Sequence, residues 1–176
     1  MAAATRNGPP PSVSAIAGDG ENPFRVLVST VISLRTKDEV TTAASQRLFA
    51  VADSPAALAA CSQDDIAAAI YPAGFYKTKA KNLKKIGRIL VERFAGAVPQ
   101  SEAELLDLPG VGRKTANLVL GLGLGIPAIC VDTHVHRIAN RLGWVSSSSP
   151  EQTEEQLCNS VPRELWIELN GTLVSF

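Results

Sequence analysis

Apolar residues recur at helical spacing along most of the chain, without the strict alternation typical of surface strands. In residues 77–95, four apolar side chains fall on one face of a helix and basic side chains occupy its other faces. These apolar residues are Leu83, Ile86, Leu90 and Phe94. The pattern predicts an all-α protein with helices at about 24–34, 38–50, 55–60, 63–70, 77–95, 102–107, 114–124, 133–142, 150–160 and 163–174.

Residues that commonly begin helices stand at many of the predicted helix starts. Thr36 and Glu39 have the spacing of a capping box, in which each side chain bonds the backbone amide of the other residue. Serine N-caps are predicted at Ser54, Ser62, Ser101 and Ser149. Two of these serines precede a proline, which suits the first helical position.

The composition indicates a packed protein rather than a disordered one, because 45% of the residues are apolar. The 17 basic and 17 acidic residues balance, yet they are unevenly spread. Residues 71–141 carry 11 basic and 5 acidic side chains, whereas the segments on either side are net acidic. This cationic segment suits a polyanionic partner, and a solvated helix face explains it equally well.

The three cysteines, Cys61, Cys130 and Cys158, form neither a disulfide framework nor a recognisable set of metal ligands. We therefore expect a reducing compartment and no bound metal. The longest uncharged apolar stretch, Leu118–Val131, is interrupted by glycine and proline and is too short to span a bilayer. The N-terminal segment has no apolar signal region and is predicted to be a loop.

The segment LLDLPGVGRKTAN, residues 105–117, predicts two short helices joined by a tight turn. Its glycines, Gly110 and Gly112, permit backbone conformations that other residues avoid and allow close approach. The amides that begin the second helix would then face outward at the positive end of its dipole, which suits a phosphate group. An ordinary helical hairpin with a glycine-rich turn is the alternative interpretation.

The residues LPGVGRKTA in this segment resemble the helix-hairpin-helix of DNA repair proteins. A second signature, VDTHVHRIANRL, follows at 131–142. Together they resemble the helix-hairpin-helix and Gly/Pro-Asp class of DNA glycosylases, and within that class the endonuclease III family. Weaker matches are ISLRTKD at 32–38, GFYKTKAKNL at 74–83 and PRELWIELNG at 162–171. The resemblance covers about residues 23–176.

The resemblance implies a two-lobed, all-α DNA glycosylase fold with a DNA cleft between the lobes. Residues 23–126 would form a helical-bundle lobe that contains the helix-hairpin-helix at 105–124. Residues 127–176 would form the second lobe, with the N-terminal tail, residues 1–22, packed against it.

The resemblance also implies that Lys114 is the catalytic nucleophile and Asp132 its essential partner. Attack of a neutral amine on C1′ of the deoxyribose releases the base, and the resulting Schiff base allows strand cleavage by β-elimination. Such a lysine needs a low-dielectric pocket and a nearby proton acceptor. Without the resemblance, Asp132 would be interpreted as a helix N-cap and Lys114 as a phosphate contact.

A lysine at position 114 bears on the implied activity, because adenine-mismatch glycosylases of this class lack it and only excise bases. The eight-oxoguanine branch has a lysine but different surrounding motifs. The resemblance therefore implies a bifunctional glycosylase and AP lyase of base excision repair, acting on oxidised pyrimidines or abasic sites in double-stranded DNA. We further expect a monomer, in the cytoplasm with the nucleoid in a prokaryote, or in the nucleus or mitochondrion in a eukaryote.

Other residues are predicted to contact DNA. Phe75 stands where the family carries an apolar wedge that fills the gap left by an extruded nucleotide, and a core position is the alternative. Arg35 stands where better-known members carry a glutamine that faces the orphaned base, so this contact would differ here. The remaining predicted DNA contacts are Lys79, Gly110, Gly112 and Arg113. His134 and His136 have no ligand pattern and are interpreted as helix polar groups or DNA contacts.

The family commonly carries four closely spaced cysteines that bind a [4Fe–4S] cluster. The second lobe is expected to be truncated before that segment, so no cofactor is expected on residues 1–176. A cluster is expected only if the full-length protein continues beyond Phe176.

Two other functions stay open from the sequence. A non-catalytic helix-hairpin-helix module would bind DNA without cleaving it, and a monofunctional glycosylase would release the base without nicking the strand. The presence of both Lys114 and Asp132 favours the bifunctional enzyme.

Overall fold

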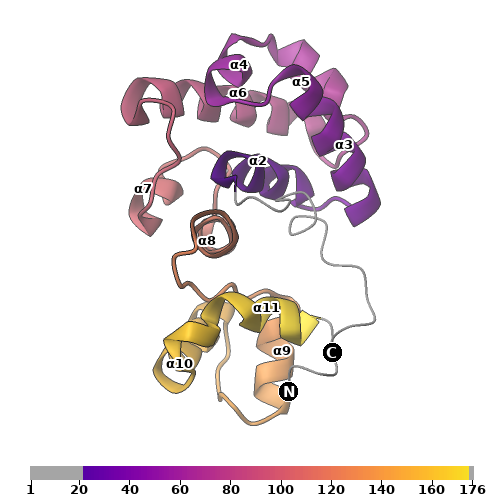
Figure 1. The fold of residues 1–176 in the computed structure, drawn as a ribbon. Coiled ribbons are helices and arrows are strands. Elements are labelled where there is room, and N and C mark those ends of the chain that lie inside the picture. The colour runs from indigo at the N-terminus through magenta and orange to yellow at the C-terminus, as the bar shows by residue number, and fades with distance from the viewer. Residues whose placement is uncertain (1–21, 175–176) are drawn as a thin grey trace.

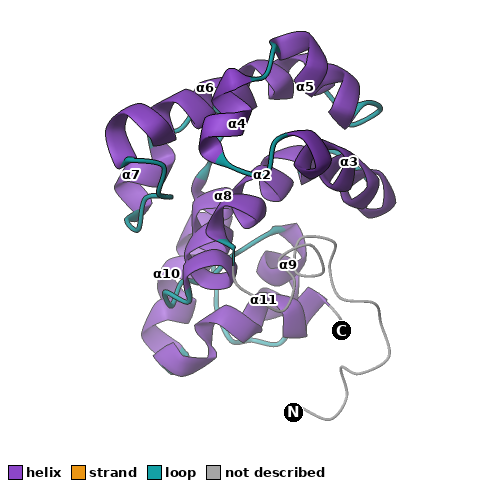
Figure 2. Ribbon diagram, turned by 45° about the horizontal axis from the view of Figure 1, so that its top comes forward, coloured by secondary structure: helices purple, strands orange, loops and turns teal. Residues whose placement is uncertain are grey.

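A computed structural model describes residues 22–174, and these residues form helices and loops without a strand (Figures 1 and 2). The helices are α2 (Pro23–Ser33), α3 (Asp38–Val51), α4 (Pro55–Ala60), α5 (Gln63–Ile70), α6 (Tyr76–Phe94), α7 (Glu102–Leu106), α8 (Arg113–Leu118), the π-helix η1 (Val119–Gly123), α9 (Thr133–Arg141), α10 (Pro150–Ser160), the 3₁₀-helix η2 (Arg163–Leu165) and α11 (Trp166–Val174). The predicted all-α fold is confirmed. The predicted packing of the tail, residues 1–22, concerns residues outside the described part of the chain, apart from Asn22.

The predicted serine N-caps are confirmed, because each of these serines accepts a hydrogen bond from a backbone amide in the first turn of its helix. The predicted capping box at Thr36 and Glu39 is wrong. The residue before α3 is Lys37, and no side chain caps this helix. The Thr36 hydroxyl lies within the loop between α2 and α3, where it bonds Gly74 and Lys79 instead.

Two separate groups of buried apolar residues form the interior. The larger group belongs to the N-terminal lobe, from α2 to η1, and the smaller group to the C-terminal lobe, from α9 to α11. Figure 1 shows the two lobes above and below α8. Helix α2 lies at the centre of the N-terminal lobe, because its sequence PFRVLVSTVIS is apolar on nearly every side and almost all of it is buried.

The predicted helix at 114–124 is α-helical only as far as Leu118, and its second half is the π-helix η1. Gly121 and Gly123 lie in this wide turn. A Cβ atom at Gly123 would stand 3.0 Å from the Cα atom of Pro23, so glycine lets η1 approach the start of α2 closely. This contact holds the second helix of the hairpin against the central helix.

Among residues 22–174, none of the helices combines the length and the apolar character needed to cross a bilayer.

Candidate active site

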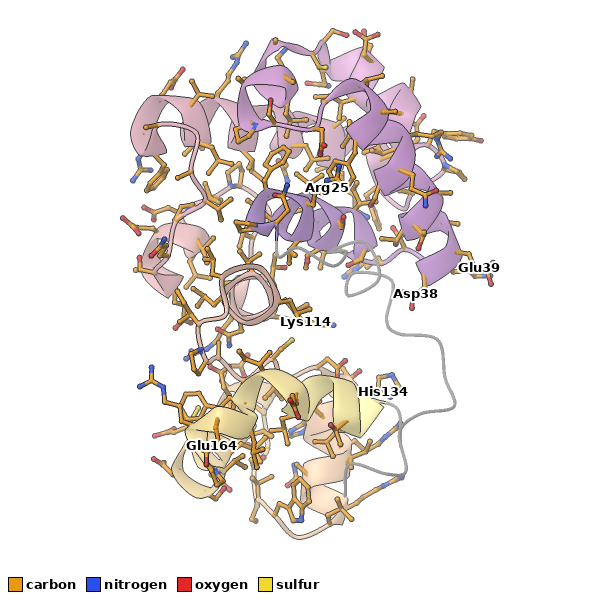
Figure 3. All side chains as sticks on the ribbon, viewed as in Figure 1. Arg25, Asp38, Glu39, Lys114, His134 and Glu164 are labelled. Atoms are coloured by element: carbon orange, nitrogen blue, oxygen red, sulfur yellow. The ribbon has the colours of Figure 1, made fainter. Side chains whose placement is uncertain are left out.

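Lys114 and Asp132 approach each other between the two lobes. Lys114 is the second residue of α8, and Asp132 immediately precedes α9. The Lys114 Nζ atom lies 3.8 Å from Asp132 Oδ2, and 49% of the lysine side chain is exposed against 15% of the aspartate side chain. Figure 3 shows Lys114 extending from α8 toward the side of the molecule on which His134 also lies. The expected low-dielectric pocket is therefore not formed around Lys114 by the described residues alone.

The two carboxylate oxygens of Asp132 have different roles. Oδ1 accepts hydrogen bonds from the amides of His134, at 2.9 Å, and Val135, at 2.8 Å, and so caps α9. The second oxygen, Oδ2, is the one that faces Lys114. The N-cap and the lysine contact therefore coexist in one residue.

Bonds between α8 and the segment before α9 keep Lys114 close to Asp132. The buried Asn117 side chain donates to the carbonyl of Ile129 at 2.9 Å. The thiol of Cys130 points to the carbonyl of Lys114, with 3.7 Å between Sγ and the oxygen. Burial raises the pKa of Cys130 to about 12, so this thiol stays neutral. Sequence reasoning missed Asn117, although an amide within an apolar helix is itself a signal of a buried hydrogen bond.

The two glycines of the hairpin differ in their conformation. Gly110 has a φ of +82°, and a Cβ atom there would stand 2.6 Å from the Nδ2 atom of Asn82. Gly112 has a φ of −104°, which any residue adopts, and open space surrounds the position of its Cβ. The left-handed conformation that glycine permits is therefore adopted at Gly110 and not at Gly112. Gly112 is the N-cap of α8, and without a side chain it leaves the first amides of that helix uncapped.

Arg113 connects the hairpin to the C-terminal lobe. Its Nε atom lies 3.2 and 3.1 Å from the two carboxylate oxygens of Glu154 in α10 and 3.4 Å from Glu102 Oε1 in α7. The Glu154 carboxylate raises the pKa of Arg113 above its usual value. In the protein alone, this guanidinium is bonded to carboxylates from both lobes, and its DNA contact stays a prediction. Sequence reasoning missed Glu154, since nothing in the local sequence pairs residues so far apart.

Arg35 and Phe75 lie against each other, although they come from different loops. The Arg35 guanidinium carbon is 5.7 Å from the centre of the Phe75 ring. Both side chains are exposed. Phe75 is 64% exposed, which excludes the alternative that it is a core residue. Both residues also have left-handed backbone angles, with φ of 53° and 56°. The two predicted DNA contacts are thus adjacent.

Lys79 is not placed as a phosphate contact, which corrects that prediction. It is 6% exposed, and its ammonium donates to the carbonyls of Ile32 and Leu34 and to the hydroxyl of Thr36. These three partners use all three of its N–H donors. The desolvation that comes with burial lowers the pKa of Lys79 to about 8.

The described residues do not bring together a metal or cluster site. Within residues 22–174, no three or more histidine, cysteine, aspartate or glutamate side chains gather where they could hold a metal ion. Cys61 packs against the core of the N-terminal lobe and Cys158 against that of the C-terminal lobe, while Cys130 lies beside Lys114. The three thiols of the described chain therefore do not fit a shared [4Fe–4S] cluster.

Comparison with known proteins identifies the family. Residues 28–163 match the family described as HhH-GPD superfamily base excision DNA repair protein. The chain is 54% identical to endonuclease III of Thermotoga maritima over 155 residues, which cover 88% of this chain and 73% of that protein. The chain belongs to the endonuclease III family.

Solved structures in the same family share the fold. A structure of endonuclease III trapped as a covalent intermediate with DNA matches with a TM-score of 0.82 and 33% sequence identity, over 92% of this chain and 79% of that one. The endonuclease III-like protein 1 of Bos taurus is 46% identical over 156 residues. That match covers 87% of this chain but 51% of the bovine protein, so the chain spans about half the length of its mammalian relative. Membership of the family places the chain among the DNA glycosylases of base excision repair.

Proposed function

We propose that this chain is a bifunctional DNA glycosylase and AP lyase, in which Lys114 is the nucleophile and Asp132 its electrostatic partner. One observation carries the proposal: the exposed amine of Lys114 and the carboxylate of Asp132, which come from the two lobes, lie 3.8 Å apart. An amine that only contacted phosphate would not need a carboxylate beside it, because that carboxylate would repel the phosphate.

The reaction begins with the neutral amine of Lys114, which attacks C1′ of the damaged nucleotide. The bond between C1′ and the base breaks, and the base leaves with the bonding electrons and gains a proton from water. The nitrogen then gives up a proton to water, and the ring oxygen leaves C1′ with the bonding electrons and takes up a proton as a hydroxyl group. A cationic imine then links Lys114 to the opened sugar. Loss of a proton from C2′ allows the bond between C3′ and its oxygen to break, and the phosphate leaves with those electrons. The strand is thereby cut 3′ to the lesion.

Asp132 acts on charge rather than as a strong base. Its Oδ1 is bonded to two amides at the start of α9, which fixes the orientation of the carboxylate. Its Oδ2 is free to face the reaction centre and stabilises the positive charge that develops on the sugar as the base leaves. It also lowers the energy of the cationic imine.

The substrate is double-stranded DNA that contains a damaged base or an abasic site, bound by the protein as a monomer. The target nucleotide leaves the base stack to reach Lys114, and the exposed ring of Phe75 fills the space. The uncapped amides at the start of α8 hold a backbone phosphate beside the hairpin. A nucleotide in this position covers the exposed half of Lys114 and excludes water from the amine.

The lesion class is that of oxidised pyrimidines, such as thymine glycol. The proposal rests on the lysine at position 114 and on the similarity to endonuclease III proteins at 54% and 46% identity. The compartment is the one that holds the DNA: the nucleoid region of a prokaryotic cytoplasm, or the nucleus or mitochondrion of a eukaryote.

Borohydride trapping tests the proposal, because hydride reduces the imine to a stable secondary amine that links protein and DNA. We expect the wild-type chain to be trapped on a duplex with an abasic site, and Lys114→Ala not to be trapped. Lys85→Ala, which removes an exposed lysine from α6, is the matched control and should be trapped like the wild type. A folded wild-type chain that forms no covalent product would contradict the proposal.

A denaturing gel distinguishes the two other functions that the sequence leaves open. On a thymine-glycol duplex, release of the damaged base without strand cleavage would indicate a monofunctional glycosylase. Binding without either reaction, unchanged by Asp132→Asn, would indicate a non-catalytic module.

A further inference from the structure

We propose that Lys79 is a positioning residue that holds Arg35 and Phe75 together as one preassembled unit for insertion into the DNA base stack. The inference rests on the proposed function and assigns to a buried lysine a role that its position on α6 does not suggest. It also makes the arginine at position 35 part of the wedge.

The contacts of Lys79 converge on one short segment. Its Nζ atom lies 2.6 Å from the carbonyl oxygen of Ile32, 2.5 Å from that of Leu34 and 2.8 Å from the hydroxyl of Thr36. The first of these carbonyls belongs to the last turn of α2, where the helix dipole attracts a cation. An apolar residue would fill the same space, but it would leave two carbonyls and a hydroxyl without this donor. The ammonium therefore fixes the path of the chain on both sides of Arg35.

A second contact joins this segment to the loop that carries Phe75. The amide of Gly74 donates to the Thr36 hydroxyl at 3.1 Å. A Cβ atom on Gly74 would stand 2.4 Å from the carbonyl oxygen of Arg35, so the two backbones touch at this point. Thr36 is thus shared by both loops, because it receives Lys79 from one side and Gly74 from the other.

The conformations of Arg35 and Phe75 show the result of this network. Both have positive φ values, which L-residues rarely adopt and which persist only where surrounding contacts determine them. Arg35 directly precedes Thr36, and Phe75 directly follows Gly74. Both strained residues therefore lie next to the hydrogen bonds of this network. Their side chains lie side by side at the surface, with the Arg35 guanidinium over the Phe75 ring.

Preassembly explains how the pair acts on DNA. A ring that replaces an extruded nucleotide and a guanidinium that contacts its former partner base must enter the stack at the same time. If the protein already holds them in contact, less conformational entropy is lost on insertion. The chemistry recognised is therefore an unpaired base and the gap beside it, whatever the sequence around the lesion.

The test separates the extrusion step from the chemistry at Lys114. Lys79→Met keeps a long apolar side chain and removes all three donors. We expect it to slow base release from a thymine-glycol duplex by about tenfold or more. Trapping on a single-stranded abasic oligonucleotide, which needs no extrusion, should stay within about twofold of the wild type, since the reacting groups are untouched.

A double-variant cycle asks whether Lys79 acts through the wedge. In a Phe75→Ala background, Lys79→Met should slow base release by less than about twofold, because the unit is already lost. The inference would be overturned if the two substitutions slowed base release by the product of their separate effects. It would also be overturned if Lys79→Met lowered activity equally on the duplex and on the single strand. A merely structural lysine would give one of these two results.

Thr36→Val keeps the test decisive if Lys79→Met does not fold. It removes the shared hydroxyl with little change of shape, and it should show the same duplex-specific loss and the same dependence on Phe75. The matched control is Thr42→Val, because that hydroxyl donates to the carbonyl of Asp38 within α3. A wild-type chain that borohydride cannot trap overturns the proposed function itself, and the inference with it. A trapped wild type with multiplying effects overturns the inference alone.

Discussion

Arg113 and Glu154 connect the hairpin of the N-terminal lobe to helix α10 of the C-terminal lobe, with 3.1 Å between Nε and the nearer carboxylate oxygen. Arg113 is followed directly by Lys114, whose partner Asp132 belongs to the C-terminal lobe. The ion pair therefore acts across the same junction as the candidate catalytic pair.

We expect Glu154→Gln to lower the rate of strand cleavage by about tenfold, because a small displacement of α8 changes the approach of Lys114 to the sugar. The loss of stability should be only about 0.5–1 kcal/mol, since half of the arginine side chain is exposed to solvent. Single-turnover cleavage of an abasic duplex and urea denaturation measure the two effects. Glu155→Gln, an exposed neighbour on α10, is the control. A cleavage rate equal to that of the control would mean that the junction does not depend on this pair.

Asp132 allows its two roles to be measured separately. Asparagine is as good an N-cap as aspartate, so Asp132→Asn should keep the cap of α9 and the stability of the protein while removing the negative charge. Asp132→Ala should also lose the cap and cost about 1 kcal/mol of unfolding free energy. Both variants should lose base release to a similar degree. Thermal unfolding and excision assays on the pair decide this, and full activity of the asparagine variant would exclude a role for the charge.

Much of the fold could be predicted from the sequence, because helix starts and apolar faces are local signals. The side chains of Ser54 and Ser149 each accept a hydrogen bond from the amide three residues later, so both caps depend on neighbours in the sequence. Asp132 could likewise be predicted both as a cap and, through the resemblance, as the partner of Lys114. These features depend on neighbours in sequence or on motifs that have their own spacing.

The features that sequence analysis could not supply are contacts between distant segments. Thr36 has the correct spacing for a capping box, but Gly74 and Lys79 bond its hydroxyl, and they come much later in the chain. Lys79 lies among exposed lysines of α6, and its ammonium is held by the end of α2 and the loop that follows it. Charged residues mostly lie at the surface, so the sequence pattern predicts an exposed lysine at position 79. Its burial depends on tertiary packing, which the local sequence does not show.

The two hairpin glycines should respond differently to the same substitution. Gly110→Ala should cost about 1–2 kcal/mol of unfolding free energy, because its φ is +82° and a methyl group would meet Asn82. Gly112→Ala should cost only about 0.5 kcal/mol, the difference between glycine and alanine at an N-cap. It should nevertheless weaken DNA binding, because a methyl group would stand beside the uncapped amides. Urea denaturation and a binding titration at fixed salt measure both effects. Equal destabilisation by the two substitutions would disprove this assignment.

The buried ammonium of Lys79 should make stability depend on alkaline pH. Burial lowers its pKa from the usual 10.5 to about 8 in the folded chain. Between these two values the unfolded chain binds a proton that the folded chain has released, so the unfolding free energy rises with pH. Below the lower value both states are protonated and this dependence disappears. The difference between wild type and Lys79→Met, measured by urea denaturation at pH 7 and pH 10, isolates the lysine from other titrating groups. We expect the wild type to gain stability relative to the variant as the pH rises. A relative loss would show that the three acceptors outweigh burial and keep the ammonium charged.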